Sequence, residues 1–222
     1  MKESIATSNS ANRKKGFQTK QLTILGLMIA VMIIFSFTPI GSIPIGPLVI
    51  SLQVIPMAIC AIVLGPKGGA IGGAVFGILS FLQCFGIGVP SGMGAILVDI
   101  NPFLAFIQRF VPRLLDGFLI GWIFIAARRK NTYFACAITG FFSAFLNTVF
   151  FMTALVWLFG NTEYVQGLIG GRNIIVFICA FVGVNAVCEM IASTVITGLV
   201  GTGLFKARVI PANTKNQTKS AS

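Results

Sequence analysis

An apolar run in the last quarter of the chain gives the first indication of the fold: NIIVFICAFVGVNAVCEMIASTVITGLVGTGLF, Asn173–Phe205, in which Glu189 is the one charged residue. A membrane-spanning helix needs about 20 largely apolar residues, so this run is long enough to cross a bilayer. A carboxylate at membrane depth costs roughly 2.5–3.5 kcal/mol on insertion scales, and a chain keeps one where it is shielded, paired or used. Glu189, with Asn185 one helical turn before it, therefore indicates a polar site between helices.

The rest of the chain has the same apolar character. Of its 222 residues, 56% are hydrophobic and 9% are charged, whereas soluble domains carry about 25% charged residues. Further uncharged runs cover Gln21–Pro66, Gly68–Val98 and Asn131–Thr162. The sequence therefore predicts a small, all-α integral membrane protein.

Proline, glycine and polar residues divide the apolar runs into six expected helices. They are Gln21–Phe37, Ile50–Leu64, Gly69–Phe85, Pro102–Ala127, Tyr133–Phe159 and Asn173–Phe205. The first ends before Thr38-Pro39, because the residue before a proline disfavours helix, and the second ends at a turn over residues 65–68. We therefore expect a six-helix transmembrane bundle over residues 21–205, between polar tails over residues 1–20 and 206–222.

The distribution of basic residues predicts the topology. The formal net charge is +11, which in a soluble protein would suggest nucleic-acid binding. When six helices are drawn, however, all 16 basic residues except Arg109, Arg113 and Arg172 fall on one side of the membrane. This is the positive-inside pattern, and it predicts that both termini are cytoplasmic. The charge therefore indicates topology and contact with membrane lipid, with no nucleic-acid partner.

Residue usage argues against catalysis and metal binding. The chain has no histidine, and its five cysteines lie inside apolar runs without a CxxC pair. Such cysteines are expected to be small buried hydrophobic residues. The sequence contains no phosphate-binding loop, nucleophile motif or metal triad. We therefore expect no catalytic residue, no cofactor and no metal, and no ATP hydrolysis by this chain alone.

Polar residues recur inside the expected helices. Arg109, Arg113 and Asp116 share one face near the outer end of the fourth helix. Two interpretations stay open: an Arg113–Asp116 pair with Arg109 reaching the headgroups, or an anion clamp, since a guanidinium fork binds a carboxylate bidentately. Other helices carry Gln53, Gln83, Asn147, Asn185 and Glu189. Each alone could join two helices, but a set drawn from several helices indicates a shared polar pocket.

Small residues spaced four apart let helix backbones approach closely. Such residues are Gly69, Gly73 and Gly77 on the third expected helix, Gly117 and Gly121 on the fourth, and Gly26 and Ala30 on the first. We expect the first two groups to pack inside the bundle, whereas Gly26 and Ala30 could face a partner protein. The chain shows no internal repeat, which argues against a secondary transporter built from two related halves.

Several short stretches combine with this helix pattern. In chain order they are Gly26-Leu27-Met28-Ile29-Ala30, Phe37-Thr38-Pro39-Ile40-Gly41, Ile43-Pro44-Ile45-Gly46-Pro47-Leu48, Leu64-Gly65-Pro66-Lys67-Gly68-Gly69-Ala70, Phe110-Val111-Pro112-Arg113, Leu146-Asn147-Thr148 and Asn185-Ala186-Val187-Cys188-Glu189. With them, residues 22–206 resemble the substrate-binding S components of energy-coupling factor (ECF) vitamin transporters, and in particular the pantothenate-type members. Ile50-Ser51-Leu52-Gln53 departs from that type and is closer to the biotin-type segment.

The resemblance implies a non-catalytic subunit that binds a water-soluble vitamin, here pantothenate, in a bacterial plasma membrane. Its expected partners are the ECF transmembrane coupling subunit, onto which Gly26 and Ala30 would dock, and two cytoplasmic ATPase subunits. Arg109 or Arg113 would meet the carboxylate of the vitamin. The residues expected to serve its other polar groups are Gln53, Asn147, Asn185 and Glu189.

Other functions stay open at this point. One is an S component for another vitamin, such as biotin, riboflavin or folate. Another is a stand-alone secondary transporter that uses Glu189 as a proton site. A membrane enzyme with Glu189 or Asp116 as general acid or base fits least, because five acidic residues and no histidine offer little catalytic apparatus.

Overall fold

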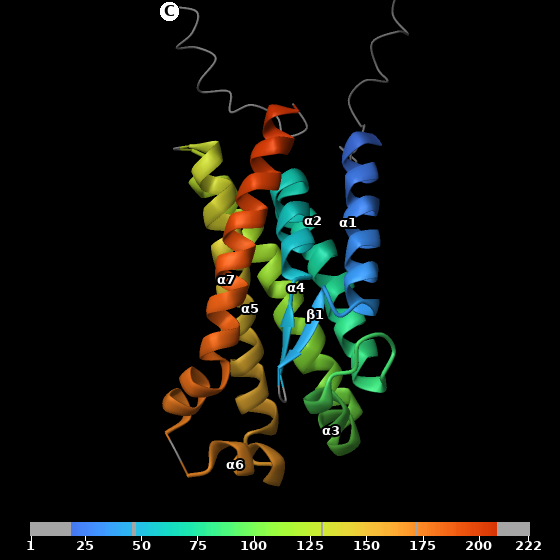
Figure 1. The fold of residues 1–222 in the computed structure, drawn as a ribbon, viewed down its shortest axis with the longest axis vertical. Coiled ribbons are helices and arrows are strands. Elements are labelled where there is room, and N and C mark those ends of the chain that lie inside the picture. Colours follow the sequence, from blue (N-terminus) through green and yellow to red (C-terminus); the bar gives the residue numbers. More distant parts are fainter. Residues whose placement is uncertain (1–18, 46–47, 130, 172, 208–222) are drawn as a thin grey trace, which may run out of the picture.

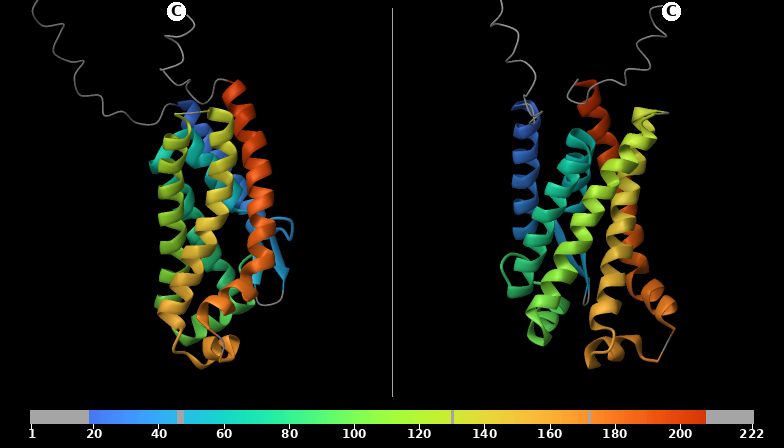
Figure 2. Two further views of the ribbon diagram at one scale, coloured as in Figure 1. Left: turned by 90° about the vertical axis from the view of Figure 1, so that its left-hand side faces the viewer. Right: turned by 180° about the vertical axis from the view of Figure 1, so that it is seen from behind.

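The computed structural model describes residues 19–45, 48–129, 131–171 and 173–207, which form a helical bundle with one small antiparallel hairpin (Figures 1 and 2). In chain order the elements are α1 Thr19–Phe37, β1 Ser42–Ile45, β2 Leu48–Ser51, α2 Val54–Leu82, η1 Gln83–Phe85, α3 Gly92–Ile100, α4 Pro102–Ala127, α5 Thr132–Phe159, α6 Glu163–Ile169 and α7 Ile174–Lys206. The predicted all-α class is confirmed. The start of α1 and the end of α7 lie at the same end of the bundle (Figure 1).

Four of the described helices are long and apolar enough to cross a membrane. They are Val54–Phe85, Pro102–Ala127, Thr132–Phe159 and Asn185–Lys206, and Gln21–Phe37 is a shorter apolar helix. This confirms a multi-pass membrane protein. Six separate crossings and the side on which the termini lie stay predictions.

Helix α2 turns back on itself at Gly65. Gly65 has φ 71° and ψ −160°, a backbone conformation that glycine adopts without the steric cost of a Cβ. A Cβ built on Gly72 would lie 3.3 Å from Cβ of Cys60, and residues twelve apart meet only where the chain reverses. The turn expected between the second and third helices is therefore present, as a sharp kink inside α2.

The structure differs from the expected helices mainly on the outer side of the predicted topology. The helix expected from Ile50 begins at Val54, because residues 48–51 form β2, which pairs with β1 in the register Ser42↔Ser51 and Ile45↔Leu48. β-branched residues such as Val49 and Ile50 favour strands, which accounts for the difference. The two expected outer connections contain the short helices α3 and α6.

Close backbone contacts join the second arm of α2 to α4. A Cβ on Gly69 would clash with the carbonyl oxygen of Gly117, and a Cβ on Gly73 with that of Arg113. The glycine stripes on these two helices therefore pack inside the bundle, as the sequence predicted, and bring the α4 backbone against α2. This packing fixes the face that α4 turns toward the bundle interior.

Enlarging one of these glycines tests the packing. We expect Gly73→Ala to lower the free energy of unfolding by about 1–3 kcal/mol, because the added methyl group has no space against the α4 backbone. Unfolding in detergent, followed by circular dichroism, measures the effect. Gly203→Ala on α7 is the matched control: a Cβ there meets nothing within 4 Å, and alanine favours helix over glycine. Equal stability of the two variants would contradict the prediction.

The buried apolar residues form two clusters along the bundle. The first includes Met32, the first arm of α2, Phe124 and Ala144. The second includes Met93, Met152 and Val182. On α5, Asn147 and Thr148 lie between Ala144 of one cluster and Met152 of the other. A polar region with apolar packing at both ends is shielded from bulk water, which strengthens electrostatic interactions inside it.

The cysteines follow the expectation in part. Cys60, Cys84 and Cys136 are free and buried, whereas Cys188 on α7 is exposed. The prediction that the five cysteines are buried was therefore wrong for Cys188, and the side chain of Cys179 lies outside the described part of the structure. In a membrane-spanning helix an exposed small hydrophobic residue faces lipid at little cost.

A buried polar pocket between the helices

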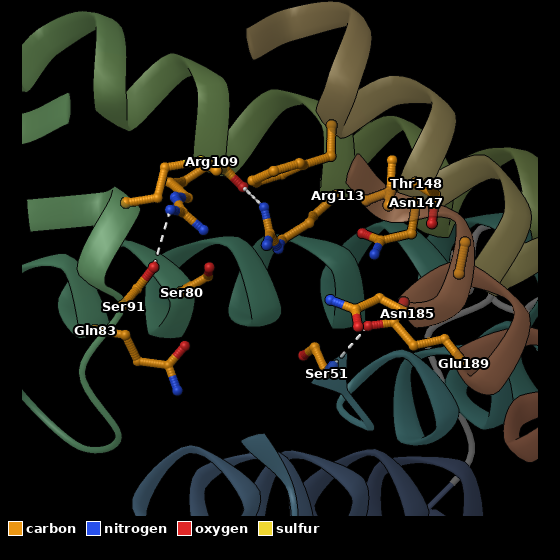
Figure 3. A pocket seen from close by; sticks show the side chains of 14 residues that line it. Ser51, Ser80, Gln83, Ser91, Arg109, Arg113, Asn147, Thr148, Asn185 and Glu189 are labelled. Atoms are coloured by element: carbon orange, nitrogen blue, oxygen red, sulfur yellow. Dashed lines mark hydrogen bonds between the residues drawn. The ribbon is translucent and has the colours of Figure 1, made fainter. Parts of the chain in front are cut away.

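A pocket opens between α2, α4, α5 and α7, and the end of β2 lies at its edge (Figure 3). Its empty space, with the open mouth and its solvent included, is about 670 Å³. Its polar lining residues are Ser51, Ser80, Gln83, Ser91, Arg109, Arg113, Asn147, Thr148, Asn185 and Glu189, and its apolar ones are Met93, Phe151, Val182 and Ala186. Five of the six residues that the sequence predicted for binding therefore line one pocket.

The basic side of the pocket comes from α4. Arg109 and Arg113 are one helical turn apart on the buried face and are 6% and 4% exposed. Nη2 of Arg109 donates a hydrogen bond to Ser91 Oγ at 3.2 Å. Nη1 of Arg113 donates one to the carbonyl oxygen of Arg109 at 2.9 Å. Within the described residues, Nε of each arginine has no hydrogen-bond partner. These Nε atoms are buried, but the two hydrogen bonds above use one terminal nitrogen of each arginine, so each guanidinium group keeps other terminal donors for a bound anion.

The opposite side of the pocket carries amide and carboxylate groups. Asn147 comes from α5, while Asn185 and Glu189 are one turn apart on α7, and all three are buried. The backbone N–H of Ser51 donates to Glu189 Oε1 at 2.7 Å, which ties the end of β2 to α7. Asn147 Oδ1 has no hydrogen-bond partner among the described residues. This side can accept and donate hydrogen bonds but carries no cation.

Asp116 lies outside the pocket lining, further along α4. It is fully buried, and neither of its carboxylate oxygens has a hydrogen-bond partner within the described residues. The hydrogen-bonded Arg113–Asp116 pair that the sequence left open is thus not formed here. Arg109 is buried and lines the pocket (Figure 3). Of the two interpretations of these arginines, the geometry favours the anion clamp.

Gln53 is the one predicted binding residue that does not line the pocket. Its side chain is fully buried, and its Nε2 donates to Ser42 Oγ at 3.2 Å. Gln83, which does line the pocket, donates from Nε2 to the same Ser42 oxygen at 3.2 Å. Ser42 in β1 therefore links the start of α2 to the pocket wall. Gln53 therefore contacts the hairpin, and its part in ligand binding stays a prediction.

Several lining residues were missed by sequence reasoning. They are Ser51, Ser80, Ser91, Met93, Thr148, Phe151, Val182 and Ala186. Thr148 follows Asn147 directly, and Ser91 precedes α3 as its N-cap, so both carried a weak signal. The others are common residue types in apolar helices, and nothing in their spacing marks them.

The residues expected to dock a partner lie apart from the pocket, on α1. A Cβ on Gly26 would meet nothing within 4 Å, and Ala30, one turn later, is exposed. The opposite face of α1 buries Leu25, Met32 and Ser36. The small-residue stripe of α1 therefore faces away from the bundle and leaves space for a second helix.

Comparison with known proteins gives two kinds of match. The model of the family described as "ECF transporter, substrate-specific component" matches residues 20–201. The Pantothenate transporter PanT of Leuconostoc mesenteroides subsp. mesenteroides is 29% identical over 195 residues, which cover 83% of this chain and 91% of that protein. The Pantothenic acid transporter PanT of Lactococcus lactis subsp. cremoris is 26% identical over 212 residues, 87% of this chain and 98% of that protein.

Proposed function

Because the chain belongs to the substrate-specific components of ECF transporters, we propose that it binds pantothenate in the pocket between α4, α5 and α7 and delivers it for uptake. The observation that carries the proposal is the pair of buried arginines, Arg109 and Arg113. They lie opposite a pocket wall that carries two amide groups and one carboxylate group. The names of the two relatives support the choice of vitamin.

The basic side of the pocket suits the carboxylate of pantothenate. Burying an anion without partners is very costly, and an arginine fork offsets this cost with charge-assisted hydrogen bonds. Arg109 and Arg113 lie on adjacent turns of one helix and both line the pocket, so either guanidinium group can bind the carboxylate. The hydrogen bond from Arg109 Nη2 to Ser91 Oγ leaves other N–H donors of the guanidinium group for the ligand.

The opposite side suits the rest of the molecule. Pantothenate carries one amide and two hydroxyl groups, which can both donate and accept hydrogen bonds. Asn147 and Asn185 offer both kinds of group, and Glu189 accepts. Met93 and Val182 offer apolar contact for the methyl groups of the ligand. A carboxylate at this side also disfavours binding of the anion in the reverse orientation.

We place the basic end of the bundle in the cytoplasm. The start of α1, the kink of α2 and the end of α4 lie at one end of the bundle (Figure 1). In the sequence, Lys67 follows the kink at Gly65 and Arg129 follows the end of α4. The positive-inside rule assigns that end to the cytoplasm. Arg109 lies about two turns from the other end of α4, so the pocket is nearer the outer surface, where the vitamin is captured.

Uptake is proposed to use an external energy source. Importing an anion against an inside-negative potential costs about 2.3 kcal/mol per 100 mV, and the chain carries no ATP-binding motif. The partners proposed are the ECF transmembrane coupling subunit, docked on α1, and two cytoplasmic ATPase subunits. In this arrangement the chain itself performs no catalysis.

Direct binding measurements test the proposal. The purified protein in detergent is titrated with pantothenate by calorimetry, with biotin, riboflavin and folate as comparison ligands. We expect saturable binding of pantothenate and no comparable affinity for the other three. Mass spectrometry of small molecules that purify with the protein gives an independent identification. Tight binding of another vitamin in place of pantothenate would overturn the substrate assignment and leave the family assignment intact.

Glu189 variants test the acidic side of the pocket. Glu189→Gln keeps an oxygen that can accept from the Ser51 N–H, so we expect its pantothenate affinity to stay within about tenfold of wild type. Glu189→Ala leaves that donor and the facing group of the ligand without an acceptor, so we expect a loss of about 1–3 kcal/mol, or roughly 5- to 150-fold in affinity. A folded Glu189→Gln variant without binding would show that the charge itself is needed. Wild-type affinity in both variants would remove Glu189 from the site.

A further inference from the structure

The guanidinium groups at the pocket are accompanied by aromatic rings. Arg113 Cζ lies over the Phe76 ring, 4.5 Å from its centroid, and over the Phe151 ring at 5.2 Å. Arg109 Cζ lies over the same Phe151 ring at 5.0 Å. Phe76 comes from α2 and is fully buried, and Phe151 comes from α5 and lines the pocket. Arg113 therefore has a ring from each of two helices, and both arginines share Phe151.

No carboxylate among the described residues accepts a hydrogen bond from Arg109 or Arg113. Asp116 has no hydrogen-bond partner within the described residues, and Glu189 Oε1 accepts from the Ser51 N–H. The hydrogen bonds that Arg109 and Arg113 do make in the described part of the chain go to a hydroxyl and a carbonyl oxygen. Within the described residues, the two buried cations therefore share a pocket wall without a hydrogen-bonded counterion.

An aromatic ring and a carboxylate stabilise a cation in different ways. The face of the ring attracts a cation within about 6 Å through its quadrupole. This interaction uses none of the N–H donors, which lie in the guanidinium plane, whereas a carboxylate would occupy two of them. The hydrogen bonds of Arg109 and Arg113 within the described residues each use one terminal nitrogen, which agrees with an arrangement that leaves terminal donors free.

We propose that Phe151 and Phe76 are positioning residues for anion recognition: their rings hold Arg109 and Arg113 charged and unpaired, and so make the pocket selective for a carboxylate over a neutral ligand of the same shape. The ring of Phe151 contacts both guanidinium groups and lines the pocket, whereas the ring of Phe76 contacts Arg113 and acts through it. For its ligand, the inference rests on the proposed function.

Selectivity measurements test the proposal. Affinities for pantothenate and for panthenol, its uncharged alcohol analogue, are compared in wild type, Phe151→Leu, Phe151→Tyr and Phe76→Leu. We expect each leucine variant to weaken pantothenate binding about 2- to 30-fold while changing panthenol binding less, and Phe151→Tyr to keep the wild-type ratio. Phe159→Leu is the matched control, since Phe159 is buried on the same helix within the second apolar cluster. An unchanged ratio in both leucine variants overturns the proposal.

A second measurement does not depend on the ligand. Melting temperatures in detergent are compared in a double-mutant cycle of Phe151→Leu with Arg113→Met, and again of Phe76→Leu with Arg113→Met. We expect the loss of each ring to lower the melting temperature by about 2–4 °C more in the wild-type background than in the Arg113→Met background. Equal shifts in both backgrounds for both rings overturn the proposal. If pantothenate fails to bind wild type while the cycles show coupling, the proposed function fails and the role of the rings stands.

Discussion

Arg113→Ala is expected to weaken pantothenate binding by about 30- to 5,000-fold, because it leaves the buried carboxylate of the ligand without its bidentate partner. Removing one member of a buried, hydrogen-bonded charge pair costs about 2–5 kcal/mol, much of it from the charge left unpaired. Arg109→Ala is expected to fall in the same range, since its guanidinium lies at the same pocket wall and keeps free donors. Titration calorimetry on the purified variants measures both effects.

Two further variants make this prediction specific. Arg113→Lys keeps the charge but loses the planar fork, so we expect an affinity between those of wild type and Arg113→Ala. Arg129→Ala removes an equal charge from an exposed residue just after α4, and its affinity is expected to match wild type. If Arg109→Ala and Arg113→Ala are both folded and bind as wild type does, the anion clamp is wrong and the carboxylate is held elsewhere.

The polar pocket could be anticipated from the sequence because its main residues are expensive in a membrane. An arginine or a carboxylate in an apolar membrane helix almost always faces the protein interior. The residue types alone therefore predicted that Arg109, Arg113 and Glu189 lie in a polar site. Asn147 and Asn185 followed by the same argument in weaker form. Helical periodicity then places residues four apart on one face, which is why the two arginines, and Asn185 with Glu189, came out adjacent.

The same argument went too far for Gln53. A buried amide needs partners, but these need not be a ligand, and in the structure Ser42 of the hairpin accepts its hydrogen bond. The hairpin itself was not predicted, because its short strands lie in a stretch rich in glycine and proline that reads as a loop. Because the hairpin was not predicted, Ser42 could not be predicted as the hydrogen-bond partner of Gln53.

Residues of ordinary type in the pocket could not be found from the sequence. A serine in a membrane helix can bond to the carbonyl of its own preceding turn, so its presence carries little cost and little information. Phe151 is one of 21 phenylalanines, and only its distance from two guanidinium groups sets it apart. Such roles depend on which helices become neighbours, and one sequence alone does not fix that.

A large side chain on the face of α1 that points away from the bundle is expected to abolish vitamin uptake while leaving vitamin binding nearly intact. Gly26 and Ala30 are one turn apart on an exposed face, and a Cβ on Gly26 meets nothing within 4 Å, so we expect the fold to tolerate tryptophan at either residue. A stripe of small residues lets a partner helix approach closely, and a large side chain there prevents it. Gly26→Trp and Ala30→Trp are therefore expected to fold and to bind pantothenate, but not to dock on the coupling subunit.

The measurement pairs uptake of labelled pantothenate in cells that contain an ECF module with binding to the purified variants. Leu199→Trp, at a residue of α7 that is 70% exposed, is the matched control for added bulk and should keep both uptake and binding. A stand-alone carrier would show equal uptake in hosts with and without the module, and that result would contradict the proposed energy coupling. Since the pocket lies between α4, α5 and α7 and the stripe lies on α1, loss of uptake with binding retained is expected only if capture and docking use separate surfaces. Wild-type uptake by both α1 variants would place the docking surface elsewhere on the bundle.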